Sequence, residues 1–272
     1  MSLEAFRRVE RDAWEKGAYG YWESFGPVFQ PVSAQLLDRL ALRTGDQVLD
    51  VATGPGWVAG AAAARGAHVF GADISRSMVD LAARLYPAAK FIQADAEALP
   101  FGQSRFDLSV SNLGLSHVAR PTRMVAEMVR VTRDGGRVVV TTHDEPDATA
   151  LVGLMNEAVM DAGVERPPSL PQGPSIFHHG FPGNEMFASL LEAAGLRDVM
   201  VSRIAFCYRT TTAGLWDILS RGSTSVALLL EAQSLTSRRR LKAAFARLAM
   251  RYGTLDQLDV PISIKFAVGT HG

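Results

Sequence analysis

Three aspartates and a glycine-rich turn are the residues whose types and spacing could bind a small ligand. Residues 48–59 read VLDVATGPGWVA and contain the pattern G-x-G-x-x-A, in which backbone amides approach a ligand and a helix begins. Asp50 stands just before Gly54, and Asp73 and Asp95 each end a short apolar segment. Carboxylates accept hydrogen bonds from hydroxyl and amino groups and attract cations. The pattern therefore suits a ligand that carries such groups.

Alternating strands and helices are predicted to position these residues. Short apolar segments typical of strands cover residues 47–51, 68–73, 90–95, 106–111 and 137–142. Helical patterns lie between them, and this alternation predicts an α/β fold with a parallel, doubly wound sheet that is covered on both faces. Ligands of such sheets bind outside the carboxyl ends of the strands. Asp50, Asp73 and Asp95 would meet at that edge.

Further helices and two more strands are predicted outside this alternating region. Residues 1–31 indicate one or two short helices closed by Pro27 and Pro31, because proline interrupts a helix. Residues 198–208 and 262–268 indicate strands. The expected division is N-terminal lid helices at 1–32, a ligand-binding core at 33–145, and a C-terminal part at 146–272 that completes the sheet and carries helical cap insertions at about 147–180 and 213–252.

Composition and charge exclude several classes of protein. The 28 Lys and Arg side chains balance the 28 Asp and Glu, which argues against a nucleic-acid partner held by a basic surface. One cysteine, Cys207, permits neither an internal disulfide nor a cysteine-based zinc site, and no metal is expected. The charged N-terminus lacks a signal-peptide pattern, and no apolar run reaches about 18 residues. These features predict a cytoplasmic protein without a membrane span.

Asp50 distinguishes between two ligands that the glycine turn could hold. A dinucleotide would bring its pyrophosphate near this carboxylate, and two like charges ~4 Å apart cost about 4 kcal/mol at an effective dielectric of about 20. S-adenosylmethionine has no phosphate and carries a sulfonium and an ammonium group, so the carboxylate favours it. Asp73 follows Gly54 by about 20 residues, where a carboxylate can bind the ribose diol of either ligand. We therefore expect S-adenosylmethionine rather than NAD(P).

The order and spacing of these segments also resemble a known family. VLDVATGPGWVA, GADIS, QADAEALPF, FDLSVSNLGLSHV and RDGGRVVVTT are similar to segments of the class I S-adenosylmethionine-dependent methyltransferases, especially the small-molecule group that includes the ubiquinone and menaquinone biosynthesis enzymes. The resemblance covers about 33–145. It implies a Rossmann-like, seven-stranded, mostly parallel sheet with helices on both faces and an antiparallel last strand between the fifth and sixth. Helical lid insertions would cover the crevice and form the acceptor pocket.

Carried over position by position, the resemblance implies a complete cofactor site. Its members are Asp50, Ala52, Gly54, Gly56, Asp73, Ile74, Ser75, Met78, Asp95, Ala96, Asn112 and Leu113. Asp50, Gly54 and Gly56 would line the methionyl end, and Asp73 would bind the ribose hydroxyls. Ser75 or Met78 would lie beside the adenine, and Asp95 with the backbone at Ala96 would hold its amine. Asn112 and Leu113 would border the sulfonium. The family often has glycine where Ala52 stands, so we expect a slightly tighter loop that still binds.

Methyl transfer to an oxygen or carbon can use a general base. His117 follows the fourth predicted strand and His143 the fifth, so both are candidates, with a structural role as the alternative for each. Candidates for the lining of an apolar acceptor pocket are Trp14, Tyr19, Trp22, Phe177, His178, Phe181 and Trp216, for which packing against the core is the alternative. The sequence thus predicts methylation of a small, mostly apolar metabolite, such as a quinone, phenol or polyketide-like molecule.

Other functions stay open at this point. The chain could bind S-adenosylmethionine without transferring its methyl group, because cofactor binding and acceptor chemistry are separate features. An NAD(P)-dependent oxidoreductase is the less favoured alternative. The segment SNLG follows the fourth strand in place of N-P-P-Y/F, which counts against amino-methylation of nucleobases or glutamine. The expected partner is a small-molecule acceptor and not a nucleic acid, and a homodimer stays open as the assembly.

Overall fold

The computed structural model describes residues 2–145, 148–165 and 183–272 of the chain. Its centre is one seven-stranded sheet with the strand order β3-β2-β1-β4-β5-β7-β6. The strands are β1 (Gln47–Val51), β2 (His68–Asp73), β3 (Lys90–Gln93), β4 (Phe106–Ser111), β5 (Thr132–His143), β6 (Leu196–Thr210) and β7 (Leu258–His271). Neighbours among β1 to β5 pair in parallel, and β7 lies antiparallel between β5 and β6. The predicted α/β, Rossmann-like sheet is confirmed.

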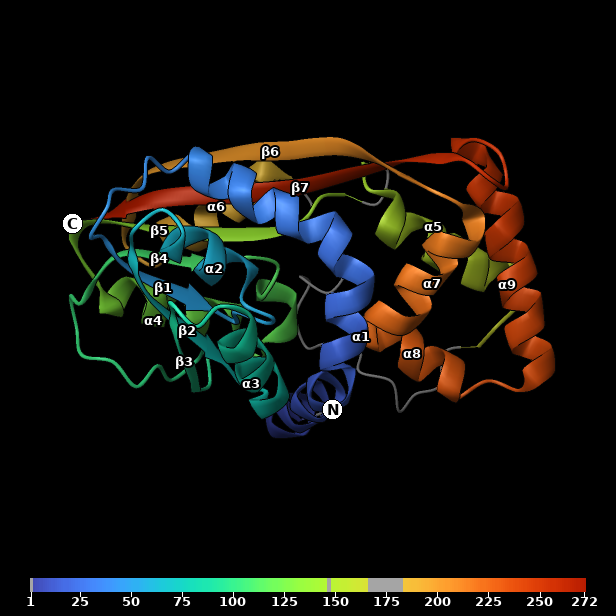
Figure 1. Cartoon of the computed structure of the whole chain (residues 1–272), viewed down its shortest axis with the longest axis horizontal. Helices are drawn as coiled ribbons and strands as arrows, with labels where there is room; N and C mark the ends of the chain where they lie inside the picture. Colours follow the sequence, from blue (N-terminus) through green and yellow to red (C-terminus); the bar gives the residue numbers. More distant parts are fainter. Residues whose placement is uncertain (1, 146–147, 166–182) are drawn as a thin grey trace.

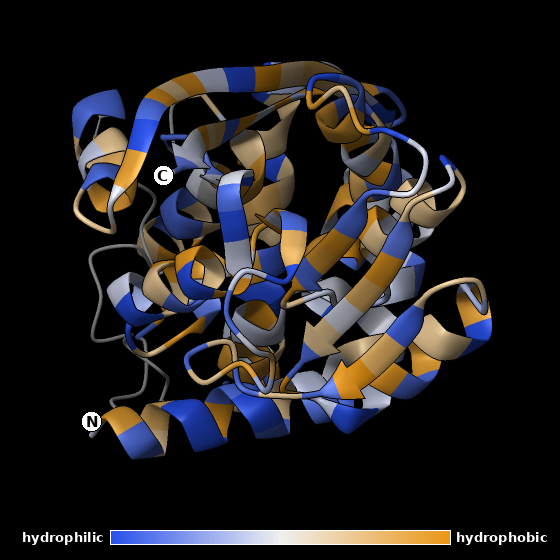
Figure 2. Ribbon diagram, turned by 90° about the vertical axis from the view of Figure 1, so that its left-hand side faces the viewer, coloured by the Kyte–Doolittle hydropathy of each residue, from blue (hydrophilic) through white to orange (hydrophobic). Residues whose placement is uncertain are grey.

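Alternate residues of the central strands face two separate apolar layers, because successive side chains of a strand point to opposite faces. Val48 and Val139 belong to the layer that contains α1 (Leu3–Asp38) and α2, whereas Leu49 and Val140 belong to the layer of α4 and α6. The helices that flank the sheet are α2 (Trp57–Ala63), α3 (Arg76–Leu85), α4 (Pro121–Val131) and α6 (Asn184–Glu192). Hydrophobic colouring runs along the central strands in Figure 2, as expected for strands that are covered on both sides.

A group of helices extends beyond one end of the sheet, at the right of Figure 1. It consists of α5 (Ala150–Asp161), α7 (Thr212–Gly222), α8 (Thr224–Glu231) and α9 (Leu235–Ala249). These four helices are called the helical cap below. α9 packs on α5 and α7, and α7 packs on α1. Among the described residues, no helix has both the length and the apolar character needed to cross a membrane.

The N-terminal region differs from the sequence prediction. It forms a single 36-residue helix, α1 (Leu3–Asp38), which contains Pro27 and Pro31 instead of ending there. The prediction that these prolines close separate helices is therefore wrong. The helix changes direction along its length (Figure 1), as helices do at prolines. Phe29, Val32 and Leu36 are buried beyond or between the prolines, and this packing against the core holds the helical path that the prolines alone would interrupt.

Candidate cofactor and acceptor site

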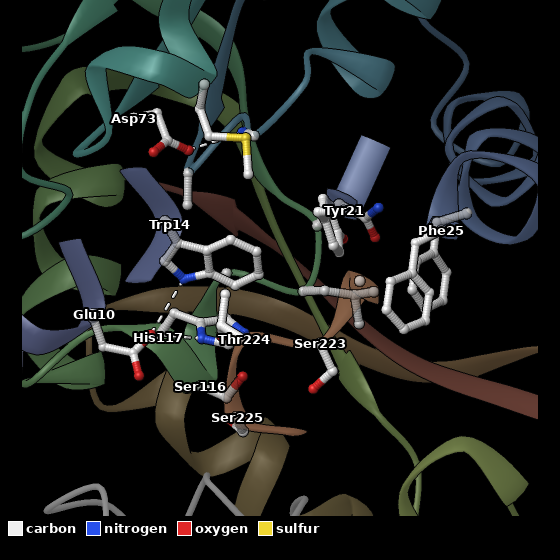
Figure 3. A pocket seen from close by; sticks show the side chains of 18 of the residues that line it. Glu10, Trp14, Tyr21, Phe25, Asp73, Ser116, His117, Ser223, Thr224 and Ser225 are labelled. Carbon is white, nitrogen blue, oxygen red and sulfur yellow. Dashed lines mark hydrogen bonds and ion pairs between the residues drawn. The ribbon is translucent and has the colours of Figure 1, made fainter. Parts of the chain in front are cut away.

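A cavity of about 670 Å³ lies at the carboxyl ends of the strands, between the sheet, α1 and the helical cap. This is within the usual size range of ligand pockets. Asp50, Asp73, Asn112 and His143 reach it from strand ends, and Figure 3 shows several of the side chains that α1 and the helical cap contribute. The cavity therefore joins the predicted ligand edge of the sheet to the two helical regions.

Two buried carboxylates flank the glycine turn. Asp50 is 1% exposed and accepts hydrogen bonds from the Thr53 hydroxyl (2.6 Å) and the Ala59 amide (3.0 Å). Burial raises its pKa to about 7, and the nearby Asp73 carboxylate adds to this effect. Asp73 accepts from the Gly54 amide at 2.8 Å, and burial raises its pKa also. In the described parts of the chain, neither carboxylate has a Lys or Arg partner, so this end of the cavity favours a cationic ligand.

The backbone around the turn has the open, strained geometry of a ligand cradle. Gly54 has φ +52°, and a Cβ added there would meet no atom within 4 Å. Ala52 and Leu113 also have positive φ values, 54° and 62°, which are unfavourable for residues with a side chain. The Leu113 amide donates to Thr141 Oγ1 at 2.8 Å, and that hydroxyl donates to Asn112 Oδ1 at 2.7 Å. Strain held by surrounding contacts in this way is typical of functional sites.

The third acid lies where α1 meets the end of β3. Asp95 Oδ1 accepts from the Glu97 amide at 2.8 Å, and its Oδ2 is 3.7 Å from Nε of Arg7 on α1. Arg7 also forms an ion pair with the buried Glu97. The predicted residues Ile74, Met78 and Ala96 line the same cavity. The N-terminal part of α1 therefore closes this side of the cavity through charged contacts, in line with the hydrophilic bands along it in Figure 2.

Two residues predicted to bind the cofactor lie outside the cavity lining. A Cβ at Gly56, whose φ is +86°, would lie 3.0 Å from the Ala82 and Tyr86 side chains, so this glycine permits close packing of α2 against α3. Ser75 caps α3: its hydroxyl accepts from the Met78 amide at 3.2 Å and donates to Glu15 of α1 at 2.8 Å. Both residues have packing or capping roles that spacing alone does not distinguish from ligand contact.

Three of the four described aromatic residues that were predicted to line the acceptor pocket lie elsewhere. Tyr19 is 52% exposed and packs edge-on against Trp22, and Trp216 packs against Phe245 of α9. These three are not among the lining residues, whereas Trp14 is. Phe177, His178 and Phe181 lie outside the described residues. The apolar lining comes instead from Phe25, Phe29, Leu151, Met155, Leu219 and Leu229, and hydroxyl groups come from Ser116, Ser223, Thr224 and Ser225.

His117 forms a partly buried pair with a glutamate of α1. Its Nδ1 lies 2.9 Å from Oε2 of Glu10, and the Trp14 indole donates to the same oxygen at 3.2 Å. The His117 and Trp14 rings pack edge to face with centroids 4.9 Å apart (Figure 3). Glu10 is only 7% exposed. Sequence reasoning missed Glu10, and its one signal was the spacing of four residues to Trp14, which places both on one helix face.

His143, the second predicted base, has a different environment. It is half-buried beside the Phe29 ring, at a centroid distance of 5.9 Å. Its Nδ1 is buried and has no hydrogen-bond partner among the residues that the structure describes. Burial lowers its pKa to about 4, and the nearby His117 contributes to this. The following residue, Asp144, points into an ion cluster with Arg203 and Lys265.

Comparison with known proteins agrees with this geometry. Residues 49–140 match the methyltransferase domain family. The chain is 32% identical over 185 residues to a demethylmenaquinone methyltransferase of Beutenbergia cavernae, covering 66% of this chain and 74% of that protein. The corresponding enzyme of Paenarthrobacter aurescens is 29% identical over 186 residues, 66% of this chain and 71% of the relative. The chain belongs to the class I S-adenosylmethionine-dependent methyltransferases.

Solved structures share the fold at lower sequence identity. A phosphoethanolamine N-methyltransferase of Haemonchus contortus, solved with phosphomonomethylethanolamine and S-adenosylhomocysteine, superposes with a TM-score of 0.60 at 19% identity. The match covers 96% of this chain and 60% of that one. At this level of identity the similarity concerns the fold alone.

Proposed function

We propose that this methyltransferase acts on an oxygen or carbon of a small, mostly apolar acceptor, with His117 as the general base. The observation that carries the proposal is that one cavity holds both the Asp50–Asp73 carboxylates and His117 with its Glu10 partner. The first pair suits the cationic cofactor, and the second suits removal of a proton from the acceptor. Glu10 is then a positioning residue, because it acts through His117.

The residues that line the cavity fit S-adenosylmethionine part by part. Asp50 would hold the ammonium group, and Asp73 the ribose hydroxyls next to the Gly54 turn. Asp95 and the backbone at Ala96 would hold the adenine amine, with Ile74 and Met78 against the ring. Asn112 and Leu113 would border the sulfonium. The carboxylates support this fit: Asp50 and Asp73 are both buried with raised pKa values, and a bound cation would lower these pKa values again.

When bound, S-adenosylmethionine supplies a methyl carbon on a positively charged sulfur, and the electron pair of the broken carbon–sulfur bond stays on the neutral thioether product. The chain itself must position the acceptor and accept its proton. With Nδ1–H of His117 donating to Glu10, the lone pair of Nε2 is free to take the proton of an acceptor hydroxyl. The oxygen's electron pair then forms the bond to the methyl carbon.

The charges of the lining favour a neutral or enolic acceptor. Arg7 is the one Arg or Lys among the lining residues that the structure describes, and it pairs with Glu97. A phosphorylated acceptor, such as the ligand in the Haemonchus contortus structure, would face carboxylates here. The apolar chamber instead suits an aromatic ring, and the demethylmenaquinone methyltransferases to which the chain is similar point the same way. We therefore propose a quinol or phenol as the acceptor class.

The test starts with calorimetric titration of S-adenosylhomocysteine, with NAD and NADP as controls. We expect binding of the thioether alone, at micromolar affinity. Radiolabelled S-adenosylmethionine is then supplied with 1-naphthol or with 1,4-dihydroxynaphthalene under anaerobic conditions. Methyl uptake that is lost in His117→Ala supports the proposal. Thioether binding without methyl uptake by either probe would contradict it and favour a protein that binds S-adenosylmethionine for another purpose.

A further inference from the structure

We infer that His143 is a second polar contact for the acceptor and binds an acceptor oxygen other than the one that His117 deprotonates. The inference rests on the proposed function and narrows its substrate class. It assigns different roles to His117 and His143. His117 takes a proton from the acceptor, and His143 binds an acceptor oxygen that is not deprotonated in the reaction.

The first observation is an unused polar group in a ligand cavity. His143 lies at the end of β5, lines the cavity, and packs beside Phe29 of α1. Its buried Nδ1 has no hydrogen-bond partner within the described part of the chain. Buried polar atoms are almost always hydrogen-bonded, so an unpaired nitrogen on a ring that lines a ligand cavity supports a contact between this ring and the ligand.

The second observation concerns the carboxylate next to His143 in the chain, which does not pair with the His143 ring. Asp144 is the carboxylate nearest to His143 in sequence, but it accepts from Ser263 at 2.7 Å and lies 2.7 Å from Arg203. It also contacts the fully buried Lys265 at 3.2 Å. The hydrogen bonds and ion pairs of the Asp144 carboxylate are thus made with side chains of β6 and β7. Within the described ranges, no carboxylate pairs with His143 as Glu10 pairs with His117, so His143 is not built as a base.

The electrostatic environment agrees with this division. Burial and the neighbouring His117 lower the pKa of His143 to about 4, so its ring is neutral at physiological pH. A neutral imidazole offers one donor and one acceptor. A group with so low a pKa is a weak base near neutrality, but a neutral imidazole with a lowered pKa can polarise a carbonyl or hydroxyl oxygen by donating a hydrogen bond.

The pair of histidines therefore suits an acceptor with two oxygen functions on an apolar skeleton. Hydroquinones, hydroxyquinones and enolised diketones belong to this class, whereas a simple monophenol offers an oxygen to His117 only. Phe25, Phe29, Leu151 and Met155 give the apolar surface for the skeleton. A site that hydrogen-bonds a substrate oxygen discriminates strongly against an analogue without it, because the buried polar group is then left unpaired.

The experiment compares 1,4-dihydroxynaphthalene with 1-naphthol, which differ by one hydroxyl. Their dissociation constants are measured anaerobically with protein saturated in S-adenosylhomocysteine. The wild type should bind the dihydroxy compound about ten-fold tighter or more. His143→Phe and His143→Leu, two apolar replacements of different volume, should lose this preference, while His143→Gln keeps part of it because an amide can donate. His68→Gln, an exposed histidine at the start of β2, is the matched control.

The outcomes separate this inference from the proposed function. A wild-type preference that survives in every folded His143 variant, as checked by thermal unfolding, would overturn the role of His143 alone. So would equal affinity of the wild type for both probes. Failure of the wild type to bind either probe, or to bind S-adenosylhomocysteine, would overturn the proposed function and this inference together.

Discussion

Nδ1 of His117 and Oε2 of Glu10 lie 2.9 Å apart, and they come from segments 107 positions apart in the chain. One belongs to the loop after β4 in the core, and the other to the first turns of α1. The contact means that the candidate base is complete only when α1 lies over the cavity. Glu15 of α1 likewise binds the cap of α3 through Ser75 and Ser77, so charged contacts fix this part of α1 at several points.

The first prediction concerns this pair. His117→Ala should lower kcat by about 10²–10⁴-fold with an unionised phenol, the usual contribution of a general base. Glu10→Gln should also lower kcat, by up to about 10⁴-fold, because the amide can favour the other tautomer of the ring and does not stabilise its charge. With a nitro-substituted phenol that is already ionised at the assay pH, both losses should nearly disappear.

The acceptor dependence separates base catalysis from a structural role. Glu23→Gln is the control, because Glu23 lies on α1 and makes an exposed ion pair with Arg221. It should leave kcat with either phenol unchanged. Equal losses with the ionised and the unionised acceptor in the His117 and Glu10 variants would show that the pair only maintains the shape of the cavity.

Much of the cofactor end could be predicted from sequence because it depends on strand ends. Asp50, Asp73 and Asp95 each follow an apolar segment, and a parallel sheet brings such positions to one edge. The acceptor end depends on how helices pack, which local patterns do not specify. Trp216 faces Phe245 within the helical cap, and the prolines of α1 suggested a helix end that tertiary packing overrides. Glu10 could not be assigned while the path of α1 was unknown.

A second prediction follows from the buried Asp50. Its pKa is raised to about 7, so the carboxylate is protonated below that pH and carries a charge above it. Affinity for S-adenosylmethionine should therefore rise as the pH increases from about 6 to 8. Asp50→Asn should bind the cofactor about 10- to 100-fold more weakly at pH 8, the loss expected for a charge-assisted hydrogen bond. It should also flatten the pH dependence, as calorimetric titration would reveal. A pH profile that is the same in both proteins would refute the assignment.

The same group should affect the stability of the ligand-free protein in the opposite direction. Burial raises the pKa of Asp50 from 3.8 to about 7, so between these values the folded state keeps a proton that the unfolded state releases. The contribution of Asp50 to the free energy of unfolding must then fall as pH rises through this window. Comparing the wild type with Asp50→Asn by urea unfolding at pH 5 and pH 8 isolates this term. The wild type should lose more stability than the variant over this interval, and an equal change in both would count against a raised pKa.

The last prediction concerns backbone strain at Ala52. Its φ of 54° lies in the left-handed region, which costs about 1–2 kcal/mol for a residue with a side chain and nothing for glycine. Part of that gain is offset because glycine makes the unfolded chain more flexible. Ala52→Gly should therefore raise the free energy of unfolding by ~1 kcal/mol and keep S-adenosylhomocysteine binding, as urea unfolding and titration would measure.

A matched change at the neighbouring Gly114 should act in the opposite direction. A Cβ there would lie 2.6 Å from Ser111 Oγ and 2.7 Å from the Cβ of Ala52, although the φ of Gly114 is an ordinary −78°. Gly114→Ala should therefore destabilise the protein through crowding, by about 1–3 kcal/mol. In Ala52→Gly the obstructing Cβ is gone, so the double variant should lose less stability than the sum of the single effects predicts. Strict additivity would mean that the two loops do not touch in the way the structure shows.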